Sequence, residues 1–437
     1  MIALLEKAAD DSADAADCAI AVSAATSAQP DWEHRSTAER ARCIGSLRPL
    51  LSACARDLAN AVAAITDRPV AEKMVSEVLP LIEAARFLEK NAARILRSQR
   101  FGRTGRPVWL RGSSFEVHRK PYGLVLIVGP SNYPLFIPLV QVLHALAAGN
   151  AVLLKPAEGA SEPIAIFRER VLKHSAIPSG LLQVLPAAPE AARITARGVD
   201  KVFFTGSTEH GRDLLHVLAD RNTPSVMELS GADTVFVRAD ADVARAAKAI
   251  GFGLRLNAGN TCMAPHSIVV HESVATELFH ALRSVEIDGN SIYVVADDAA
   301  ALQIAQFDKH GLGAAIFSRD ETAARAFAQH LKTGFVTIND IIVPTADPRF
   351  PFGGVGASGF GTTRGAEGLL EMTYPHVIAV RRGRFLPHLE QANESDAALF
   401  ESYLAATHSA GLKERWRAAR KLFGLARQRG KRKQTHS

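Results

Sequence analysis

The sequence predicts an α/β protein with a doubly wound parallel sheet, and two observations carry this prediction. Short segments that are apolar throughout alternate with helix-like stretches over the middle of the chain. Strands of a parallel sheet that helices cover on both faces are buried on both sides, so they lack the apolar–polar alternation of half-exposed strands. The expected strands are 124–128, 151–154, 181–185, 201–205 and 225–229, and the helices between them include 137–148 and 163–173.

The regions around this core follow different patterns. A second, weaker alternation runs from residue 234 to about 338 and predicts a smaller α/β domain. The first hundred residues are alanine-rich and predict helices, one of them opened by a capping box at Ser36 and Glu39. Residues 101–120 place glycines and a proline between short β-prone pieces, which predicts a loop and a hairpin.

Length and composition indicate a globular protein. The chain has 437 residues, of which 47% are hydrophobic, enough for two or three domains with their own cores. It has no run of 18 apolar residues that would predict a transmembrane helix, and its acidic first twenty residues do not resemble a signal peptide. The four cysteines are scattered, without the spacing of metal ligands, so we expect no metal site and a reducing, cytoplasmic compartment.

The positive charge is concentrated in the last residues. Residues 411–437 hold ten Lys or Arg and one acid, a net of +9, so the rest of the chain carries −3 of the total of +6. A basic isoelectric point that comes from a tail does not predict nucleic-acid binding by the globular body. Apolar residues share one helical face of this tail, among them Trp416 and Phe423, with basic residues around them. This pattern fits a helix lying on an anionic membrane, and the alternative is a solvated helix or a disordered tail.

Cys262 is a candidate nucleophile. It follows the Gly/Asn-rich segment 257–261 and precedes an apolar stretch, 267–270, that we expect to be a strand. A thiol in such a loop can be exposed, and nearby backbone N–H groups can stabilise its thiolate or an oxyanion formed on attack. The alternative is a cysteine that fills apolar space, which is the commoner role of a lone cysteine.

Two polar residues are expected at the carboxyl ends of strands, where parallel sheets place ligands. Glu228 ends an apolar strand, and burial there would raise the pKa of its carboxyl and suit it to act as a general base. Asn132 lies between a strand and a helix and can donate side-chain N–H bonds to an oxyanion. The alternatives are a solvated glutamate at a strand end and an asparagine that forms a turn beside prolines.

Together these segments resemble the aldehyde dehydrogenase superfamily, in order and in approximate spacing. The resemblance covers about residues 100–375 and depends on six motifs, none of them specific alone. They are Pro-Ser-Asn-Tyr-Pro at 130–134, Lys-Pro-Ala-Glu at 155–158, Phe-Thr-Gly-Ser at 204–207, Glu-Leu-Ser-Gly at 228–231, Gly-Asn-Thr-Cys at 259–262, and Asn339 with Pro-Phe-Gly-Gly at 351–354 through Ser-Gly at 358–359.

The resemblance implies a fold and a set of roles. The fold would be a doubly wound cofactor domain, a smaller α/β catalytic domain and β arms that form a homodimer. Cys262 would attack an aldehyde, Asn132 and the Cys262 N–H would hold the oxyanion, and Glu228 would activate the water that hydrolyses the thioester. The cofactor would be NAD, with NADP as the alternative, because a carboxylate at Glu158 repels a 2′-phosphate. The residues implied along the cofactor are Pro130, Ser131, Lys155, Glu158, Gly206 and Ser207.

The domain boundaries follow from the same resemblance. We expect a cofactor domain at 1–229 with an arm at 101–120, a catalytic domain at 230–372, a second arm at 373–386 and a basic extension at 387–437. The Gly-x-Gly-x-x-Gly match at 354–359 does not follow an apolar strand, so it predicts a loop near the substrate rather than a cofactor cradle.

The chain departs from the family pattern after the nucleophile. Only 51 residues separate Cys262 from Gly313, and the Glu-Glu-x-Phe-Gly-Pro segment that holds the nicotinamide ribose in the family is missing between them. Residues 286–295 occupy about the place where it should be, and Ser131 stands where the family has Trp. We therefore expect a divergent, shortened member that oxidises an aldehyde to an acid. The alternatives are a CoA-acylating dehydrogenase or acyl-thioester reductase, which an activating Glu228 disfavours, and a non-catalytic protein that kept the fold.

Overall fold

A computed structural model describes residues 13–283, 285, 291–307, 309–382, 386, 389 and 396–434. The chain divides into two compact units, which are described separately: residues 1–99 with 117–377, and residues 100–116 with 378–437. The first unit contains both parallel sheets and every residue that the sequence singled out for chemistry.

The chain begins with a series of helices, as the alanine-rich sequence predicted. The capping box is present, with the Ser36 and Glu39 side chains each bonded to the other's backbone N–H. The segment before the last helix of this series is π-helical, and two charged side chains are fully buried there, Glu77 within the segment and Lys73 directly before it. The elements are α2 (Ala13–His34), α3 (Thr37–Gly45), α4 (Leu47–Ala53), α5 (Ala55–Thr66), α6 (Val70–Lys73), the π-helical η1 (Met74–Val78) and α7 (Leu79–Ile95).

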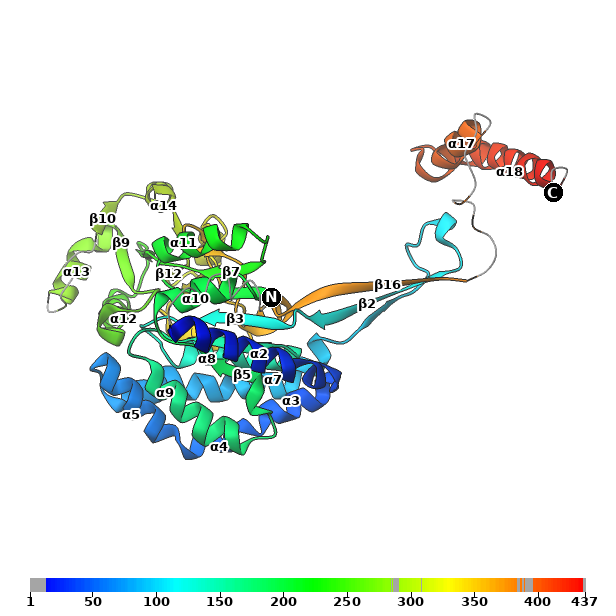
Figure 1. Cartoon of the computed structure of the whole chain (residues 1–437). Coiled ribbons are helices and arrows are strands. Elements are labelled where there is room, and N and C mark those ends of the chain that lie inside the picture. Colours follow the sequence, from blue (N-terminus) through cyan, green and yellow to red (C-terminus); the bar gives the residue numbers. More distant parts are fainter. Residues whose placement is uncertain are drawn as a thin grey trace. The chain divides into compact units, whose positions relative to one another are not determined.

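The larger sheet has six strands in the order β15-β7-β6-β3-β4-β5. Figure 1 labels β7, β3 and β5 among them. All pairs are parallel except β15, which runs antiparallel to β7. The predicted strands are confirmed, and β3, β4 and β6 are buried at every position. The strands are β3 (Leu124–Val128), β4 (Ala151–Lys155), β5 (Leu182–Val184), β6 (Lys201–Thr205), β7 (Ser225–Glu228) and β15 (Gly359–Phe360).

Helices connect and cover these strands. The predicted helix 137–148 is α8 (Phe136–Ala148), and the predicted helix 163–173 consists of α9 (Ser161–Ile166), η3 (Phe167–Val171) and η4 (Leu172–His174). The remaining connections are η5 (Ser179–Leu181), α10 (Pro189–Ala196) and α11 (Thr208–Ala219). Helix α8 is held at its C-terminus by the first helices, because Trp32 Nε1 donates to Leu146 O and the Arg40 guanidinium donates to the carbonyls of Ala147 and Ala148.

The second alternation forms a separate parallel sheet, in the order β10-β9-β8-β12-β13. Its strands are β8 (Asp233–Val237), β9 (Pro265–His271), β10 (Ser291–Val295), β12 (Gly313–Phe317) and β13 (Phe335–Ile338). Its helices are α12 (Val243–Arg255), η6 (Leu256–Gly259), α13 (Glu272–Leu282), α14 (Asp298–Phe307), α15 (Glu321–Ala328) and η7 (Val343–Ala346). The two sheets have separate hydrophobic cores, which is the arrangement of a doubly wound domain beside a smaller α/β domain.

The remaining elements lie at the end of the chain or in the predicted arms. Strands β1 (Gln99–Phe101), β2 (Ser113–Pro121) and β16 (Thr373–Arg381) form a three-stranded sheet, with η2 (Val108–Leu110) in the loop between the first two. A small pair joins β11 (His310–Gly311) to β14 (Val355–Gly356), and α16 (Gly365–Glu371) precedes β16. In the second unit α17 (Ala397–His408) packs against α18 (Leu412–Gln434), and the Trp109 and Tyr403 rings meet edge to face at 5.5 Å.

The larger sheet gathers the predicted motifs at one edge. The carboxyl ends of β3, β4, β6 and β7 lead directly into the segments that begin at Gly129, Pro156, Gly206 and Leu229. Because these strands are parallel neighbours, their carboxyl ends share one edge of the sheet. The topology therefore brings together residues that lie up to about a hundred positions apart in the sequence.

Candidate active site

Cys262 lies in a loop whose backbone the sequence makes unusual. The loop follows α12 and includes three consecutive residues with positive φ, Asn257 (53°), Ala258 (54°) and Gly259 (78°). Side chains with a Cβ seldom adopt this conformation, so other contacts must hold it. Asn257 provides them, since its Nδ2 donates to Asn132 O at 2.9 Å and its Oδ1 accepts from Lys73 Nζ at 2.6 Å.

A second contact fixes the residue next to the nucleophile. The Tyr133 hydroxyl and Thr261 Oγ1 are 2.8 Å apart, and both side chains are buried. The loop after β3 and the loop before β9 are therefore bound to each other at two points, both of them shortly before Cys262 in the sequence.

Cys262 and Glu228 line the same cavity. Its volume is about 380 Å³, and most of its wall is apolar. The structure thus brings these two predicted site residues to one space. The other lining residues are Val75, Ser76, Leu79, Pro80, Tyr133, Phe136, Ile137, Phe252, Leu256, Thr261, Met263, Ile342, Val343, Thr345, Ala346, Phe352 and Arg364.

Glu228 is the last residue of β7 and is only 5% exposed. Strand β15 covers it, with Gly359 as its partner in the antiparallel register, and Thr363 Oγ1 donates to Glu228 Oε2 at 3.2 Å. Burial raises the pKa of the Glu228 carboxyl, while the Arg364 guanidinium and the Thr363 bond oppose that rise. A carboxyl in this environment can take a proton from water near neutral pH.

The Cys262 side chain is partly buried and lines the cavity. Burial raises its pKa, and the negative charges of Glu228 and Asp233 raise it further. The Arg364 guanidinium and the Met263 N–H have the opposite effect on the thiol. The thiolate therefore depends on the few positive groups near it.

Asn132 is not among the residues that line this cavity. Its Oδ1 accepts the Tyr133 N–H at 2.9 Å, which leaves the amide NH₂ as the end of the side chain that can donate. Its main chain is tied to the nucleophile loop by the bond from Asn257. The role of Asn132 in holding an oxyanion stays a prediction.

The predicted cofactor residues lie along the strand ends. Lys155 ends β4 and is 7% exposed, and we find no hydrogen bond or ion pair from its ammonium to another described residue. Glu158 is exposed three positions later. A buried ammonium beside an exposed carboxylate offers both donor and acceptor to a pair of ribose hydroxyls, so these residues fit the cofactor.

The pyrophosphate residues fit as well. Ser207 is the N-cap of α11 and accepts the His210 N–H at 3.2 Å, and Gly206 immediately precedes it. The N-terminus of a twelve-residue helix favours an anion. Pro130 is buried and Ser131 is exposed at the neighbouring strand end. Residues 286–290, where the ribose contact of the family was expected, lie outside the described residues.

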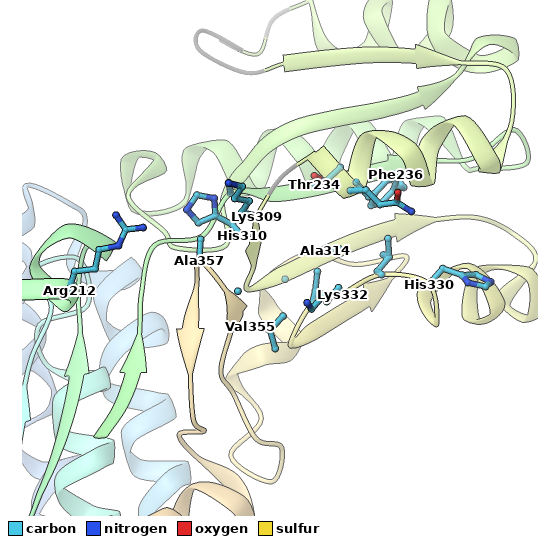
Figure 2. Close-up of a pocket in the computed structure, with 17 residues that line it drawn as sticks. Arg212, Thr234, Phe236, Lys309, His310, Ala314, His330, Lys332, Val355 and Ala357 are labelled. Atoms are coloured by element: carbon cyan, nitrogen blue, oxygen red, sulfur yellow. The ribbon is translucent and has the colours of Figure 1, made fainter. Parts of the chain in front are cut away.

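A second, wider cavity of about 630 Å³ is lined mostly by residues of the smaller α/β domain, together with Arg212 of α11. Figure 2 shows Thr234 and Phe236 of β8 on one side of it and Val355 and Lys332 on another. None of the residues predicted as catalytic or cofactor-binding lines it, although Val355, Gly356 and Ala357 belong to the loop that the sequence predicted near the substrate. We assign it no role.

Three site residues escaped the sequence reasoning. Lys73 and Glu77 are fully buried, and Glu77 Oε2 accepts the N–H groups of Leu135 and Phe136 at 3.0 and 2.8 Å, where α8 begins. A signal for Glu77 existed, because it is the single charged residue in the stretch 74–82. The third residue, Arg364, carried no signal, since its loop is rich in glycine and threonine like many surface loops.

Two further features were sought among the described residues. No group of three or more His, Cys, Asp or Glu side chains is arranged to hold a metal ion in the described part of the chain. Within the same residues, no helix has the length and apolar character needed to cross a bilayer.

Comparison with known proteins identifies the family. A model described as the aldehyde dehydrogenase family matches residues 7–285 and 290–378. A 4,4'-diapolycopene aldehyde oxidase from Methylomonas sp is 28% identical over 424 residues, which cover 81% of this chain and 79% of that protein. A 4,4'-diapolycopene-4,4'-dial dehydrogenase from Cytobacillus firmus is 26% identical over 378 residues, which cover 70% of this chain and 82% of that protein.

Solved structures agree on the fold. A structure of an NAD-dependent aldehyde dehydrogenase from Sinorhizobium meliloti superposes with a TM-score of 0.80 at 23% identity, over 86% of this chain and 89% of that one. The chain belongs to the aldehyde dehydrogenase family, and its fold and its class of enzyme are those of an NAD(P)-dependent aldehyde dehydrogenase.

Proposed function

We propose that the protein oxidises an apolar aldehyde to a carboxylic acid, with Cys262 as the nucleophile and Glu228 as the base. The observation that carries this proposal is that both side chains line one apolar cavity. A buried carboxyl with a raised pKa and a thiol beside it are the two groups that thioester formation and hydrolysis require.

The reaction begins when the Cys262 thiolate forms a C–S bond to the aldehyde carbon. The carbonyl oxygen becomes an oxyanion, which the Asn132 amide and the Cys262 N–H stabilise. Bound NAD(P) would supply the hydride acceptor that the conversion of the thiohemiacetal into a thioester requires. Glu228 then takes a proton from water, the hydroxide adds to the thioester carbon, and the C–S bond breaks to release the acid and the thiolate.

The cofactor residues follow from the strand ends. We assign the adenosine ribose to Lys155 and Glu158, and the pyrophosphate to the α11 N-terminus at Gly206 and Ser207, with Pro130 and Ser131 beside them. The carboxylate of Glu158 disfavours a 2′-phosphate, so the proposed preference is for NAD over NADP.

The cavity supports a large apolar substrate. Four of its large apolar lining residues are also exposed at the surface, Val75 at 64%, Leu79 at 52%, Phe252 at 39% and Val343 at 55%. Val75 and Leu79 also line a second groove of about 590 Å³, so the cavity continues along the surface of α7. By their names, both relatives described above act on aldehydes of diapolycopene. An extended hydrocarbon chain would fit the apolar lining of this cavity and of the groove that continues from it.

The test compares aldehydes of increasing chain length, with NAD or NADP and with or without CoA, by the absorbance of the reduced cofactor. We expect turnover without CoA and a KM that falls as the apolar chain lengthens. Leu79→Glu should raise KM for the longest aldehyde by about tenfold and leave a short one unchanged, because it charges the cavity mouth. CoA-dependent turnover would replace this proposal with the acylating activity, and no turnover together with no NAD binding would leave a non-catalytic member of the family.

The individual residues are tested by substitution. Cys262→Ala should abolish oxidation, and full activity in that variant would refute the nucleophile. Glu228→Gln should release about one equivalent of reduced cofactor in a burst and then stall, because the thioester no longer hydrolyses. A Glu228→Gln variant with the same steady rate as the parent would show that Glu228 is not the base.

We also propose that the chain forms a homodimer through its β arms. Strand β16 is an edge strand, and Tyr374, Val377, Ile378 and Val380 on it are exposed by 41 to 59%. Exposed apolar edge strands associate with other strands unless they are protected. The Val377→Lys/Val380→Lys variant should therefore elute as a monomer in light-scattering chromatography, and an unchanged mass would exclude the arm. The proposed domains remain 1–229, 230–372 and 387–437, with arms at 101–120 and 373–386.

The C-terminal helix is proposed to contact an anionic lipid surface. Leu412, Trp416 and Phe423 of α18 are 70 to 75% exposed, and basic residues flank them. Apolar side chains beside lysine and arginine suit the interface of an anionic bilayer. The chain should sediment with vesicles of anionic lipid and not with neutral vesicles, and Trp416→Glu/Phe423→Glu should lose this binding. If the parent chain never sediments, the proposal fails.

A further inference from the structure

Arg364 is the one basic residue among those that line the cavity of Cys262 and Glu228. The sequence assigned it no role. It lies in the turn between β15 and α16, directly after the threonine that donates to Glu228. A guanidinium in a mostly apolar wall is costly to desolvate, so its position calls for a physical reason.

The backbone holds Arg364 in a strained conformation. Its φ is +61°, which is uncommon for a residue with a side chain, and Gly365 follows with φ +63°. The strand-like pairing before it is tight, since Phe352 and Thr363 exchange both backbone hydrogen bonds at 2.8 and 2.7 Å. These bonds fix the backbone of Thr363, the residue directly before Arg364.

The side chain is fixed as well. Arg364 Nη1 donates to Thr345 O at 2.6 Å, and the guanidinium carbon lies 4.3 Å from the centre of the Phe352 ring and 5.7 Å from that of Phe136. No ion pair within 4 Å joins it to a carboxylate of the described residues. One of its nitrogens is thus bonded to a neutral carbonyl, and its charge is left for the groups across the cavity.

Those groups are acidic. Cys262 and Glu228 both interact with the Arg364 charge, and the carboxylate of Asp233 adds a further negative charge near the thiol. Tyr133 lies beside Cys262, and His144 lies beside Arg364. Lys73 Nζ lies 5.8 Å from the centre of the Tyr133 ring, and Glu77 acts on Tyr133 as well, but neither Lys73 nor Glu77 lines the cavity. Burial raises the pKa of Tyr133 and lowers that of His144 to about 4, so both are neutral near pH 7 and supply no counter-charge.

We propose that Arg364 is a positioning residue whose guanidinium is the counter-charge for the Cys262 thiolate and the Glu228 carboxylate. Without it, the Cys262 thiolate and the Glu228 carboxylate would line one cavity with no cationic side chain in its wall and with Asp233 as a further negative charge near the thiol, which favours the protonated forms of both. With it, the thiol can ionise for attack and the carboxylate remains able to accept a proton from water. This inference rests on the proposed function only for the role of Arg364 toward Glu228, because its effect on the Cys262 thiol can be measured without turnover.

The test measures the alkylation rate of Cys262 by iodoacetamide against pH, in the full-length chain without aldehyde or cofactor, with the modified peptide quantified by mass spectrometry. Peptide analysis separates Cys262 from Cys43, which is also partly exposed. Arg364→Met keeps the length of the side chain and removes the charge. An opposite charge nearby lowers a pKa by about 1 to 3 units, so this variant should alkylate at least about tenfold more slowly at pH 8. Arg364→Lys should restore most of the rate.

A matched control separates charge from structure. Arg349 lies fifteen residues before Arg364, and its guanidinium carbon is 5.4 Å from the centre of the Phe350 ring. It forms an ion pair with Asp347 and does not line the cavity of Cys262. Arg349→Met should leave the alkylation profile unchanged. Equal profiles for Arg364→Met and the parent would overturn the proposal, as would equal losses in Arg364→Lys and Arg364→Met.

A second readout covers the carboxylate. In Arg364→Met the lower limb of the pH profile of steady turnover should move to higher pH, because Glu228 stays protonated longer. If Arg364→Met is destabilised, Arg364→Lys and Arg364→Gln are compared instead. Arg364→Lys keeps the positive charge and should alkylate at nearly the parental rate. Arg364→Gln lacks the charge and should alkylate more slowly. An alkylation effect without any aldehyde oxidation would uphold the role toward Cys262 and refute the proposed function instead.

Discussion

Glu77 provides a prediction about stability whose size the structure sets. Burial raises the pKa of its carboxyl from 4.5 to about 7, because the side chain is fully buried and its Oε1 has no partner among the described residues. The folded protein therefore keeps a proton that the unfolded chain releases between pH 4.5 and 7. Stability from this group is complete below pH 4.5 and is lost as the pH rises through 7. At 1.36 kcal/mol for each unit, the loss is about 3 kcal/mol.

Glu77→Gln removes this dependence, since the amide keeps an oxygen for the two N–H groups at the start of α8 and cannot ionise. Urea titrations at half-unit steps between pH 4 and 8 give the free energy of unfolding of the variant and of the parent. The variant's value minus the parent's value should rise by about 3 kcal/mol from the lowest to the highest pH. Glu83→Gln is the control, because Glu83 is an exposed residue of α7. A difference between Glu77→Gln and the parent that is constant across the range would refute the reasoning.

Three other changes have definite expected outcomes. Gly231→Ala would place a Cβ 2.2 Å from Cys262 O, so the nucleophile loop must move. We expect kcat to fall at least about tenfold with a small change in Tm, and an unchanged kcat would contradict this close contact. Trp32→Phe loses the 2.8 Å bond to Leu146 O and should cost about 1 to 3 kcal/mol in urea unfolding, because that carbonyl stays buried; no loss would mean that water replaces the bond. Glu158→Ser should raise the NADP-to-NAD ratio of kcat/KM by about tenfold, and a constant ratio would remove Glu158 from the ribose site.

The sequence was informative where burial and chain order decide the structure. The strands at 124–128 and 201–205 were predicted to the residue, because a strand covered on both faces must be apolar throughout. The capping box at Ser36 was equally readable, since both partners lie within four residues. The order of short motifs gave the family and placed Cys262 and Glu228, which the structure brings to one cavity.

Contacts between distant segments were not readable. Thr363 and Gly359 reach Glu228 from more than 130 residues away, and only the antiparallel β15 brings them there. Arg364 is aimed at the cavity by a positive φ that the residue type does not favour, so propensity argues against its actual conformation. Glu77 stands alone among apolar residues, but its partners, the N–H groups of Leu135 and Phe136, are too far away in the sequence to be identified from it.

Helix α8 is held at both ends by residues that precede it by roughly sixty to a hundred and twenty positions. Glu77 binds its first N–H groups, and Arg40 and Trp32 bind its last carbonyls. During synthesis the N-terminal helices leave the ribosome before the helix that they must hold, so their buried charges stay hydrated until α8 arrives. Packing of these helices is therefore a late event in folding, and the cavity closes only when α8 is docked. A ribosome-stalled chain ending near residue 120 should expose Glu77 and Arg40 to solvent, whatever helix it has formed.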